Sequence, residues 1–223
     1  MQTTLDRIDT PEEFIYDPSL VLHLPLHMLD GTEFMDRSAY GHKAVVTGAL
    51  WTPRGRWFDN EDDYINCGQG SSLNIGTVGS LEVWVKADDP TAFDVIAGWE
   101  ISPLWPGLRF AIYLRDGYWM MALSDGTNTQ NSVVISPTST SWTHLIATID
   151  GSRVKGYANG ELKKDIEQTV IPALENVPFH LSTCQSSPNY NFGGLIGEVR
   201  IYTWALTLLE IKHNYLATKW RYR

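Results

Sequence analysis

The segment "GLIGEVRIYTWALTLLEI", residues 194–211, encodes a strand, a turn and the start of a helix. Val199 and Ile201 alternate with polar neighbours, which predicts a strand with one face in a core. Thr207 and Glu210 have the spacing of a capping box, in which each side chain satisfies a free backbone amide at the start of a helix. The segment therefore predicts a last strand that is followed at once by a short helix closing over a sheet.

Strand-like segments with a period of two continue through most of the chain. They begin at residue 19 and are separated by Gly, Asp or Asn. The dipeptides Asp150-Gly151 and Asn159-Gly160 favour the positive φ of hairpin turns. This spacing is typical of a two-sheet antiparallel sandwich, so the sequence predicts an all-β fold. The residues expected between the two sheets are Val83, Val85, Leu145, Ala147, Val199 and Ile201.

The two ends of the chain differ in composition from the middle. Residues 1–18 carry five acidic side chains against one Arg and show no sustained period. We therefore expect an N-terminal arm over residues 1–18, a sandwich over residues 19–206, and a C-terminal helix with a basic tail over residues 207–223.

The arm and the tail have opposite charge, and both contain large apolar residues. The arm has too little apolar content to order by itself, so its apolar residues are predicted to contact a surface, on another chain rather than on their own domain. Complementary ends suit a protein that docks on copies of itself or on other subunits of an assembly. The predicted contact residues are Ile8, Phe14, Ile15 and Tyr16 in the arm and Trp220 and Tyr222 in the tail.

Composition excludes several classes of protein. The net charge of −9 leaves no basic stripe for the phosphates of a nucleic acid. No apolar run reaches the roughly 18 residues of a membrane span, and the N-terminus lacks the basic start and apolar middle of a signal peptide. Cys67 and Cys184 are too few for a zinc site. We expect them to be free, half-buried thiols, with a disulfide between them as the alternative.

Several phrases occur in an order that resembles one known family. They include "RWFDNEDDYINCG" at 56–68, "SWTHLIATIDGSRVKGYANGEL" at 141–162 and the opening segment. Over roughly residues 19–211 the chain resembles the LamG-like domains of the concanavalin A-like lectin/glucanase superfamily. The resemblance implies a jelly-roll sandwich of two curved sheets. The ending "HNYLATKWRYR", residues 213–223, is similar to the ends of LamG-like domains in tailed-phage virion proteins.

The resemblance also raises the question of calcium. Members of the family commonly have Asp at the position of Gly197, and in some of them that Asp helps to hold calcium. Strand parity places Gly197 on the face of Val199 and Ile201. Because Gly has no carboxylate, we expect no cofactor, and calcium held by acidic residues elsewhere is the alternative. The candidate ligands are Asp36, Asp62 and Asp63, with Asp59 nearby, although the acidic turn also suits capping hydrogen bonds.

The sequence predicts a protein without catalytic activity. The glucan-cleaving branches of the superfamily use an E-x-D-x-x-E triplet, which places two carboxylates about 5–5.5 Å apart. That triplet is absent from this chain. Lyases of related jelly rolls use Arg, Gln or Asn, His and Tyr on one sheet, and the candidates His144, Gln185, Arg200 and Tyr202 are scattered and form no such motif. We expect His144 to be a structural residue beside Trp142.

Exposed aromatic rings with polar neighbours are the signature of sugar recognition. Trp105 lies between two prolines in a predicted loop, and other aromatic residues lie in or beside the flanking strands. A second loop, residues 186–194, mixes polar and aromatic residues. The tryptophans in strongly strand-like runs, Trp84, Trp119 and Trp142, are expected in the core. The candidate glycan-binding residues are Trp99, Trp105, Tyr113, Tyr118 and Tyr190.

Together these features predict a non-enzymatic structural or binding module. The first hypothesis is a virion surface protein, made in the host cytoplasm, that decorates a capsid or acts in adhesion and also binds glycans. The second is an extracellular carbohydrate-binding module. The third is a glycan-active hydrolase or lyase.

Overall fold

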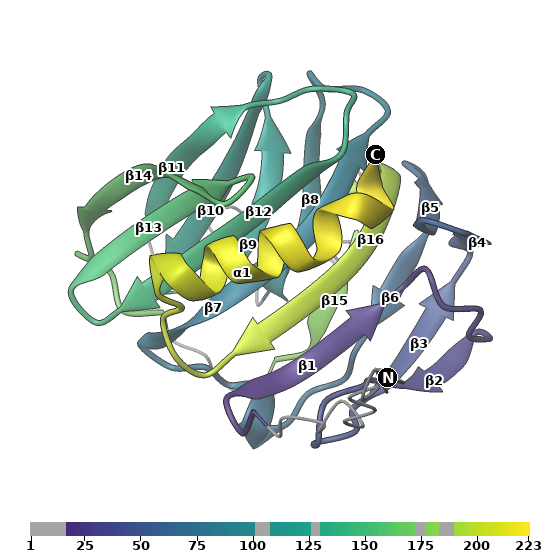
Figure 1. Ribbon diagram of the computed structural model, residues 1–223, viewed down its shortest axis with the longest axis horizontal. Helices are drawn as coiled ribbons and strands as arrows, with labels where there is room; N and C mark the ends of the chain where they lie inside the picture. The colour runs from purple at the N-terminus through teal and green to yellow at the C-terminus, as the bar shows by residue number, and fades with distance from the viewer. Residues whose placement is uncertain (1–16, 101–107, 126–129, 173–176, 183–189) are drawn as a thin grey trace, which may run out of the picture.

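The computed structural model describes residues 17–100, 108–125, 130–172, 177–182 and 190–223. Two eight-stranded antiparallel sheets face each other, and a helix crosses the outer face of one of them (Figure 1). This architecture confirms the predicted all-β, two-sheet antiparallel sandwich, and it is consistent with a jelly roll. The helix begins directly after the last strand, as the opening segment predicts.

Sheet A lies under the helix. Its strands, in spatial order, are β14 (Glu161–Glu167), β13 (Arg153–Ala158), β12 (Thr143–Asp150), β7 (Val78–Ala87), β16 (Gly193–Tyr202), β5 (Gly55–Asp59) and β4 (Leu50–Thr52). Strand β1 (Leu20–Pro25) also pairs with β16. Strand β16 thus lies near the middle of the sheet.

Sheet B forms the opposite layer. Its strands, in spatial order, are β11 (Gln130–Pro137), β10 (Tyr118–Ser124), β9 (Leu108–Arg115), β8 (Phe93–Glu100), β15 (Phe179–Leu181), β6 (Tyr64–Asn66), β3 (Lys43–Thr47) and β2 (Glu33–Met35). The described helical elements are η1 (Ser71–Leu73), α1 (Leu208–Thr218) and η3 (Lys219–Tyr222).

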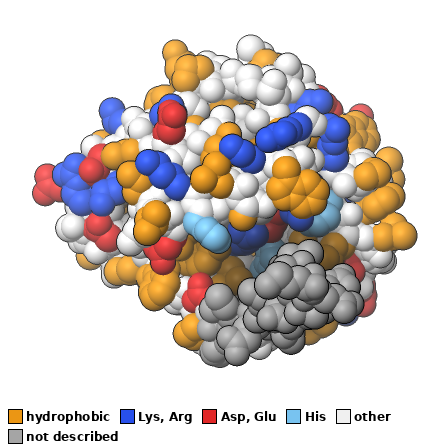
Figure 2. Space-filling view, in the orientation of Figure 1, with side chains coloured by type: hydrophobic (Ala, Val, Ile, Leu, Met, Phe, Trp, Pro, Cys, Tyr) orange, Lys and Arg blue, Asp and Glu red, His pale blue; other side chains and the backbone are white. Residues whose placement is uncertain are grey.

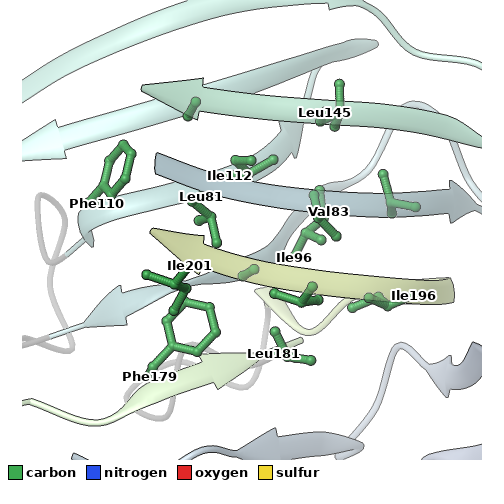
Figure 3. Close-up of a cluster of buried hydrophobic side chains, with 14 of the residues drawn as sticks. Leu81, Val83, Ile96, Phe110, Ile112, Leu145, Phe179, Leu181, Ile196 and Ile201 are labelled. Atoms are coloured by element: carbon green, nitrogen blue, oxygen red, sulfur yellow. The ribbon is translucent and has the colours of Figure 1, made fainter. Parts of the chain in front are cut away.

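The core lies between the two sheets (Figure 3). All six residues that the sequence places there are fully buried, because strands with a period of two direct every second side chain inward. Trp119 is buried in this core, whereas Trp84 is buried beneath α1 and Trp142 is half-buried. Cys67 is a free cysteine in the core, so it is more buried than predicted, and burial raises the pKa of its thiol. Cys184 lies outside the described residues.

The start of α1 confirms the predicted capping box. The hydroxyl of Thr207 accepts a hydrogen bond from the backbone amide of Glu210, and the carboxylate of Glu210 accepts one from the backbone amide of Thr207. On the side of the helix facing the sheet, Ile211 and Thr218 are buried. Nε1 of Trp84 on β7 donates to Oγ1 of Thr218 at 2.9 Å, which fixes the end of the helix to sheet A.

A β-bulge at Gly197 overturns the parity expected from the sequence. The register between β16 and β7 shifts between Ile196 and Glu198, because a bulge adds one residue to one strand and changes the side to which it points. A Cβ atom at position 197 would lie 2.3 Å from the Tyr222 ring, on the helix-covered face. Gly197 therefore does not share a face with Val199 and Ile201.

The space left by Gly197 is filled by Tyr222. The Tyr222 ring stacks on Trp84 at 4.5 Å and lies 4.8 Å from Trp142. Only 5% of Tyr222 is exposed. The prediction that Tyr222 contacts a partner is therefore wrong, because the bulge opens a place for its ring on its own sheet. Trp220 is 62% exposed, so its predicted partner contact stays a prediction.

We expect Ile201→Asp to lower the free energy of unfolding by roughly 4 kcal/mol or more, because it buries an unpaired charge between the sheets. Chemical denaturation of the purified protein measures this loss. Ile171, which is 66% exposed, supplies the matched control. Ile171→Asp should change stability by less than about 0.5 kcal/mol. Equal effects of the two substitutions would contradict the placement of β16.

We expect Gly197→Ala to destabilise the fold by roughly 1–3 kcal/mol, because the new methyl group displaces the Tyr222 ring. In a double-mutant cycle with Tyr222→Ala, the second substitution should remove the clash. The double variant should then be no less stable than Tyr222→Ala alone. Strictly additive losses would show that Tyr222 does not fill the space at Gly197.

Candidate functional site

The outer face of sheet B carries an aromatic patch formed by Phe93, Tyr113, Arg115, Tyr118 and Tyr190. Phe93 lies at its centre, with ring centroids 5.9 Å from Tyr113 and 4.5 Å from Tyr190. The guanidinium of Arg115 lies 5.0 Å above the Phe93 ring. Tyr118 pairs with Arg115 across the β9–β10 hairpin. The consecutive strands β8, β9 and β10 thus meet Tyr190, which is distant in sequence, at one place.

The hairpin turn explains how Arg115 and Tyr118 come together. Asp116 and Gly117 both have positive φ, of 51° and 84°, as a two-residue hairpin turn requires. The carboxylate of Asp116 also holds Nε of Arg115 at 3.2 Å. The sequence Arg-Asp-Gly-Tyr at 115–118 therefore presents a cation and a phenol ring side by side.

Exposure differs across the patch. Tyr118 is 44% exposed and the side chain of Arg115 is 43% exposed. Phe93 and Tyr190 are half-buried. Tyr113 is fully buried beneath them, and burial raises the pKa of its hydroxyl. The accessible part therefore combines ring faces with hydrogen-bond donors, which is the chemistry that binds the apolar face and the hydroxyl groups of a sugar.

The structure brings together three of the five predicted ligand residues: Tyr113, Tyr118 and Tyr190. The prediction is wrong for Trp99, which is 1% exposed and faces the core, with its ring 4.7 Å from Phe179. Tyr113 is also corrected, since it forms the floor of the patch and not its accessible surface. Trp105 lies outside the described residues.

Sequence reasoning missed Phe93 and Arg115. The turn at Asp116-Gly117 is a local signal that could have placed Arg115 opposite Tyr118. Phe93 carries no comparable signal, because its contact with Arg115 follows from the pairing of β8 with β9. Such a register is set by the packing of the whole sheet.

A row of small residues continues the face beyond the patch. Gly98, Ala111 and Ala122 lie in register on β8, β9 and β10, and His180 on β15 pairs with Gly98. His180 is 3% exposed, and neither ring nitrogen has a hydrogen-bond partner. Burial lowers the pKa of His180 to about 4, so the imidazole is neutral at physiological pH.

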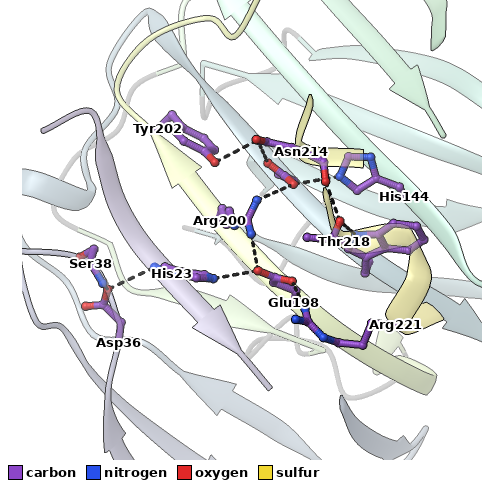
Figure 4. Close-up of polar contacts among 12 residues, drawn as sticks. His23, Asp36, Ser38, His144, Glu198, Arg200, Tyr202, Asn214, Thr218 and Arg221 are labelled. Carbon is purple, nitrogen blue, oxygen red and sulfur yellow. Dashed lines mark hydrogen bonds and ion pairs between the residues drawn. The ribbon is translucent and has the colours of Figure 1, made fainter. Parts of the chain in front are cut away.

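The outer face of sheet A carries a different constellation, a buried charge network beneath α1 (Figure 4). Arg200 lies between two carboxylates, with NH1 3.3 Å from Glu82 and NH2 2.5 Å from Glu198. Nε2 of His144 lies 2.9 Å from Glu82, and Nε2 of His23 lies 2.8 Å from Glu198. Strands β1, β7, β12 and β16, the helix α1 and the tail residue Arg221 contribute to this network.

Three of the residues considered as lyase candidates, His144, Arg200 and Tyr202, lie together in or beside this network. His144 and Tyr202 lie near Arg200, but they are only 1% and 5% exposed. Nδ2 of Asn214 on α1 donates to both Glu82 and Tyr202, so the helix closes over the group. A polymeric substrate has no access to these side chains. The network therefore has the character of a structural clamp, and His144 is a structural residue, as expected. The aromatic rings beside His144 are those of Trp84 and Tyr215, whereas the sequence predicted Trp142. Gln185 lies outside the described residues.

The family profile described as the concanavalin A-like lectin/glucanases superfamily matches residues 59–212. The chain belongs to this superfamily. The matched range includes the network strand β16 and the patch residues Phe93, Tyr113, Arg115, Tyr118 and Tyr190. Among curated proteins, none matches the chain in sequence.

Several solved structures have a fold similar to that of this chain. Domain 4 of AbnA, a GH43 extracellular arabinanase from Geobacillus stearothermophilus, in complex with arabinotriose, has a TM-score of 0.66 at 21% identity, over 87% of this chain and 97% of that one. The receptor binding domain of botulinum neurotoxin mosaic serotype C/D has a TM-score of 0.73 at 16% identity, over 91% and 51%. The binding domain of botulinum neurotoxin DC, solved with rat synaptotagmin II, has a TM-score of 0.69 at 13% identity, over 89% and 51%. This chain therefore spans about half of the neurotoxin binding domains. At these identities the similarity shows the fold.

Among the described residues, the acidic turn brings together a group of carboxylates that could hold a metal ion. Carboxylate oxygens of Asp59, Asp62 and Asp63 lie within 4.8 Å of one another. The turn also satisfies itself, since Asp63 accepts from the Asp59 amide and Asp59 accepts from the Glu61 amide. Burial and the neighbouring Asp59 raise the pKa of Asp63. Carboxylates suit calcium, so calcium at this turn stays the alternative, and the expected absence of a cofactor stays the prediction.

Asp36 does not belong to this cluster, which corrects its place among the candidate ligands. Its carboxylate accepts hydrogen bonds from the backbone amides of His23, Ser38 and His42. Those bonds fix the loop beside β1, so Asp36 serves as a loop cap. No helix among the described elements is long and apolar enough to cross a membrane.

We expect Arg200→Met to lower the free energy of unfolding at pH 7 by roughly 3–5 kcal/mol, because it leaves two buried carboxylates without their shared cation. Burial alone would raise the pKa of Glu198, but His23, Arg200 and Arg221 outweigh it and lower the pKa to about 2. The stability from this lowered pKa is complete above the ordinary pKa of about 4.3 and is lost as pH falls toward 2.

The stability difference between the natural protein and Arg200→Met should therefore shrink as pH falls from 5 to 3, measured by denaturation at each pH. The matched control is Arg153→Met, which breaks the exposed Arg153–Asp165 pair at 2.7 Å. That change should cost less than about 1 kcal/mol. A small, pH-independent effect of Arg200→Met would contradict the clamp.

Proposed function

We propose that this chain is a non-enzymatic carbohydrate-binding module whose ligand stacks on the aromatic patch of sheet B. The observation that carries the proposal is the meeting of the exposed Tyr118 ring, the half-buried Phe93 and Tyr190 rings and the Arg115 guanidinium on one open sheet face. Rings bind the C–H face of a sugar, and the guanidinium donates to its hydroxyl groups.

The patch is held in place before any ligand binds. Phe93 is packed against Tyr113 and Tyr190, and the Arg115 guanidinium lies over the Phe93 ring and beside the exposed carboxylate of Asp116. Binding then costs little ordering of side chains, which favours affinity. Because Asp116 already balances the charge of Arg115, we propose a neutral oligosaccharide as the ligand.

Two features support the absence of catalysis. Retaining hydrolysis needs two carboxylates about 5–5.5 Å apart beside the substrate. Among the five patch residues and the hairpin turn beside them, the structure offers the single carboxylate of Asp116. The carboxylates of Glu82 and Glu198 lie on the other sheet, buried beneath α1.

The test is titration of neutral oligosaccharides, arabinan and glucan fragments included, by calorimetry. We expect Tyr118→Ala and Arg115→Ala each to weaken binding by about tenfold or more, since each removes a direct contact. Tyr40, which is 45% exposed and lies on the loop beside β1, supplies a matched control. Tyr40→Ala should leave affinity unchanged.

Absence of binding across the panel, or equal losses for Tyr118→Ala and Tyr40→Ala, would overturn the patch as the site. Incubation of the same oligosaccharides with the natural protein tests catalysis separately. Release of shorter products that survives Tyr118→Ala would place an activity elsewhere on the chain.

A place on a virion surface is a second proposal, and an extracellular location is its alternative. The observation that favours an assembly is the exposed Trp220 on the tail, which is free to contact a partner. The arm residues Ile8, Phe14, Ile15 and Tyr16 lie outside the described residues. Detection of the chain in purified particles tests this proposal, and its absence from them would favour the free module.

A further inference from the structure

The solvent side of α1 and η3 carries an apolar stripe that no part of the described structure covers. Leu209, Leu216 and Trp220 are 79%, 56% and 62% exposed. Their spacings of seven and four residues place them on one side of the helix. Ile211 and Thr218 lie buried on the opposite side. Three large apolar residues in a row on a solvent-facing helix mark an interaction surface.

Basic residues border this stripe. Lys212 is exposed and Lys219 is half-buried, and Arg223 follows at the end of the chain. Figure 2, in which α1 faces the viewer, shows hydrophobic and basic side chains interspersed over this region. The acid in the first turn, Glu210, is engaged in the capping box. The helix thus presents a positive surface on a chain whose net charge is −9. We call Leu209, Lys212, Leu216, Lys219 and Trp220 the helix stripe.

We propose that residues 1–16 of a second copy of this chain bind to the helix stripe. That segment has the complementary composition, with four acids against one Arg and a run of apolar residues at its end. Apolar residues supply the affinity of such a contact, and the opposite charges supply orientation and a fast association rate. The acids are Asp6, Asp9, Glu12 and Glu13, and the apolar residues are Ile8, Phe14, Ile15 and Tyr16.

The path of the chain into β1 favours a second copy over the same chain. The Tyr40 hydroxyl donates to the Pro18 carbonyl at 3.1 Å, and the Arg37 amide donates to the His23 carbonyl at 2.8 Å. The chain therefore enters β1 with Pro18 beside the loop of residues 36–42, and the Ser19 carbonyl accepts a hydrogen bond from the Thr203 amide at 2.8 Å. Strand β1 pairs with β16, which lies between β1 and α1 (Figure 1).

The reach of the segment leads to the same conclusion. Phe14 to Tyr16 lie within three residues of Asp17, so they reach at most about 10 Å from it. Leu20 at the start of β1 packs against the cluster that contains Ile211, on the side of α1 that faces the sheet, whereas the helix stripe lies on the opposite, solvent side. The apolar end of the segment therefore reaches the stripe of a neighbouring copy more readily than the stripe of its own chain.

The test is the association state of the full chain, measured by sedimentation velocity from about 1 to 100 μM at low and high salt. We expect concentration-dependent association that weakens as salt screens the charges. Trp220→Ala and the pair Lys212→Glu/Lys219→Glu should each weaken association about tenfold or more. The matched control is the pair Lys163→Glu/Lys164→Glu on the exposed strand β14, which should have no effect.

A charge exchange identifies the occupant. The pair Glu12→Lys/Glu13→Lys should abolish self-association, and mixing this variant with Lys212→Glu/Lys219→Glu should restore it. A synthetic peptide of residues 1–16 should compete with association of the natural chain. Glycan binding, measured with Tyr118→Ala, reports on the aromatic patch alone, so the two proposals stand or fall separately.

Three results would overturn the inference. One is a chain that stays monomeric over the whole concentration range. Another is association that neither the helix variants nor the peptide changes. The third concerns a chain that sediments as a monomer. If its α1 is protected from hydrogen exchange, and the variant Phe14→Ser/Ile15→Ser loses that protection, the segment binds to the helix of its own chain.

Discussion

The arrangement of sheet A depends on the buried ion pairs of Arg200. Its guanidinium forms ion pairs with two buried carboxylates at once, Glu82 on β7 and Glu198 on β16. Each carboxylate also binds a histidine from a further strand. Asn214 of α1 and Arg221 of the tail complete their coordination by hydrogen bonds. A buried charge is tolerated only when its partners are all present, so the sheet, the helix and the tail are mutually dependent.

The clamp also determines which face of the sandwich is free. α1 crosses the outer face of sheet A, and Tyr222 fills the space above Gly197. The two binding surfaces proposed for this chain are the aromatic patch of sheet B and the outer side of the helix. Sheet B offers rings and a guanidinium, which suit a sugar, whereas the helix offers leucines, a tryptophan and lysines, which suit an acidic peptide.

These two surfaces lie on opposite sides of the molecule, with both sheets between them. Occupation of one leaves the other accessible, so a chain that associates through its helix keeps its aromatic patch open. Several linked copies would then present several patches at once, and simultaneous binding raises the apparent affinity for a polymeric glycan. Self-association and glycan binding are thus compatible in one module.

The sequence by itself determined the strands, the turns and the helix start, because these depend on neighbours within a few residues. The alternation around Val199 and Ile201, the hairpin at Asn159-Gly160 and the capping box at Thr207 are all local. The superfamily followed from the order of such phrases. Only the tertiary structure decided which rings are accessible. Trp99 and Tyr118 lie in equally strand-like segments, yet one faces the core and the other faces solvent. The bulge at Gly197, the meeting of Phe93 with Arg115 and the burial of Tyr222 depend on register between strands distant in the chain, which no local pattern records.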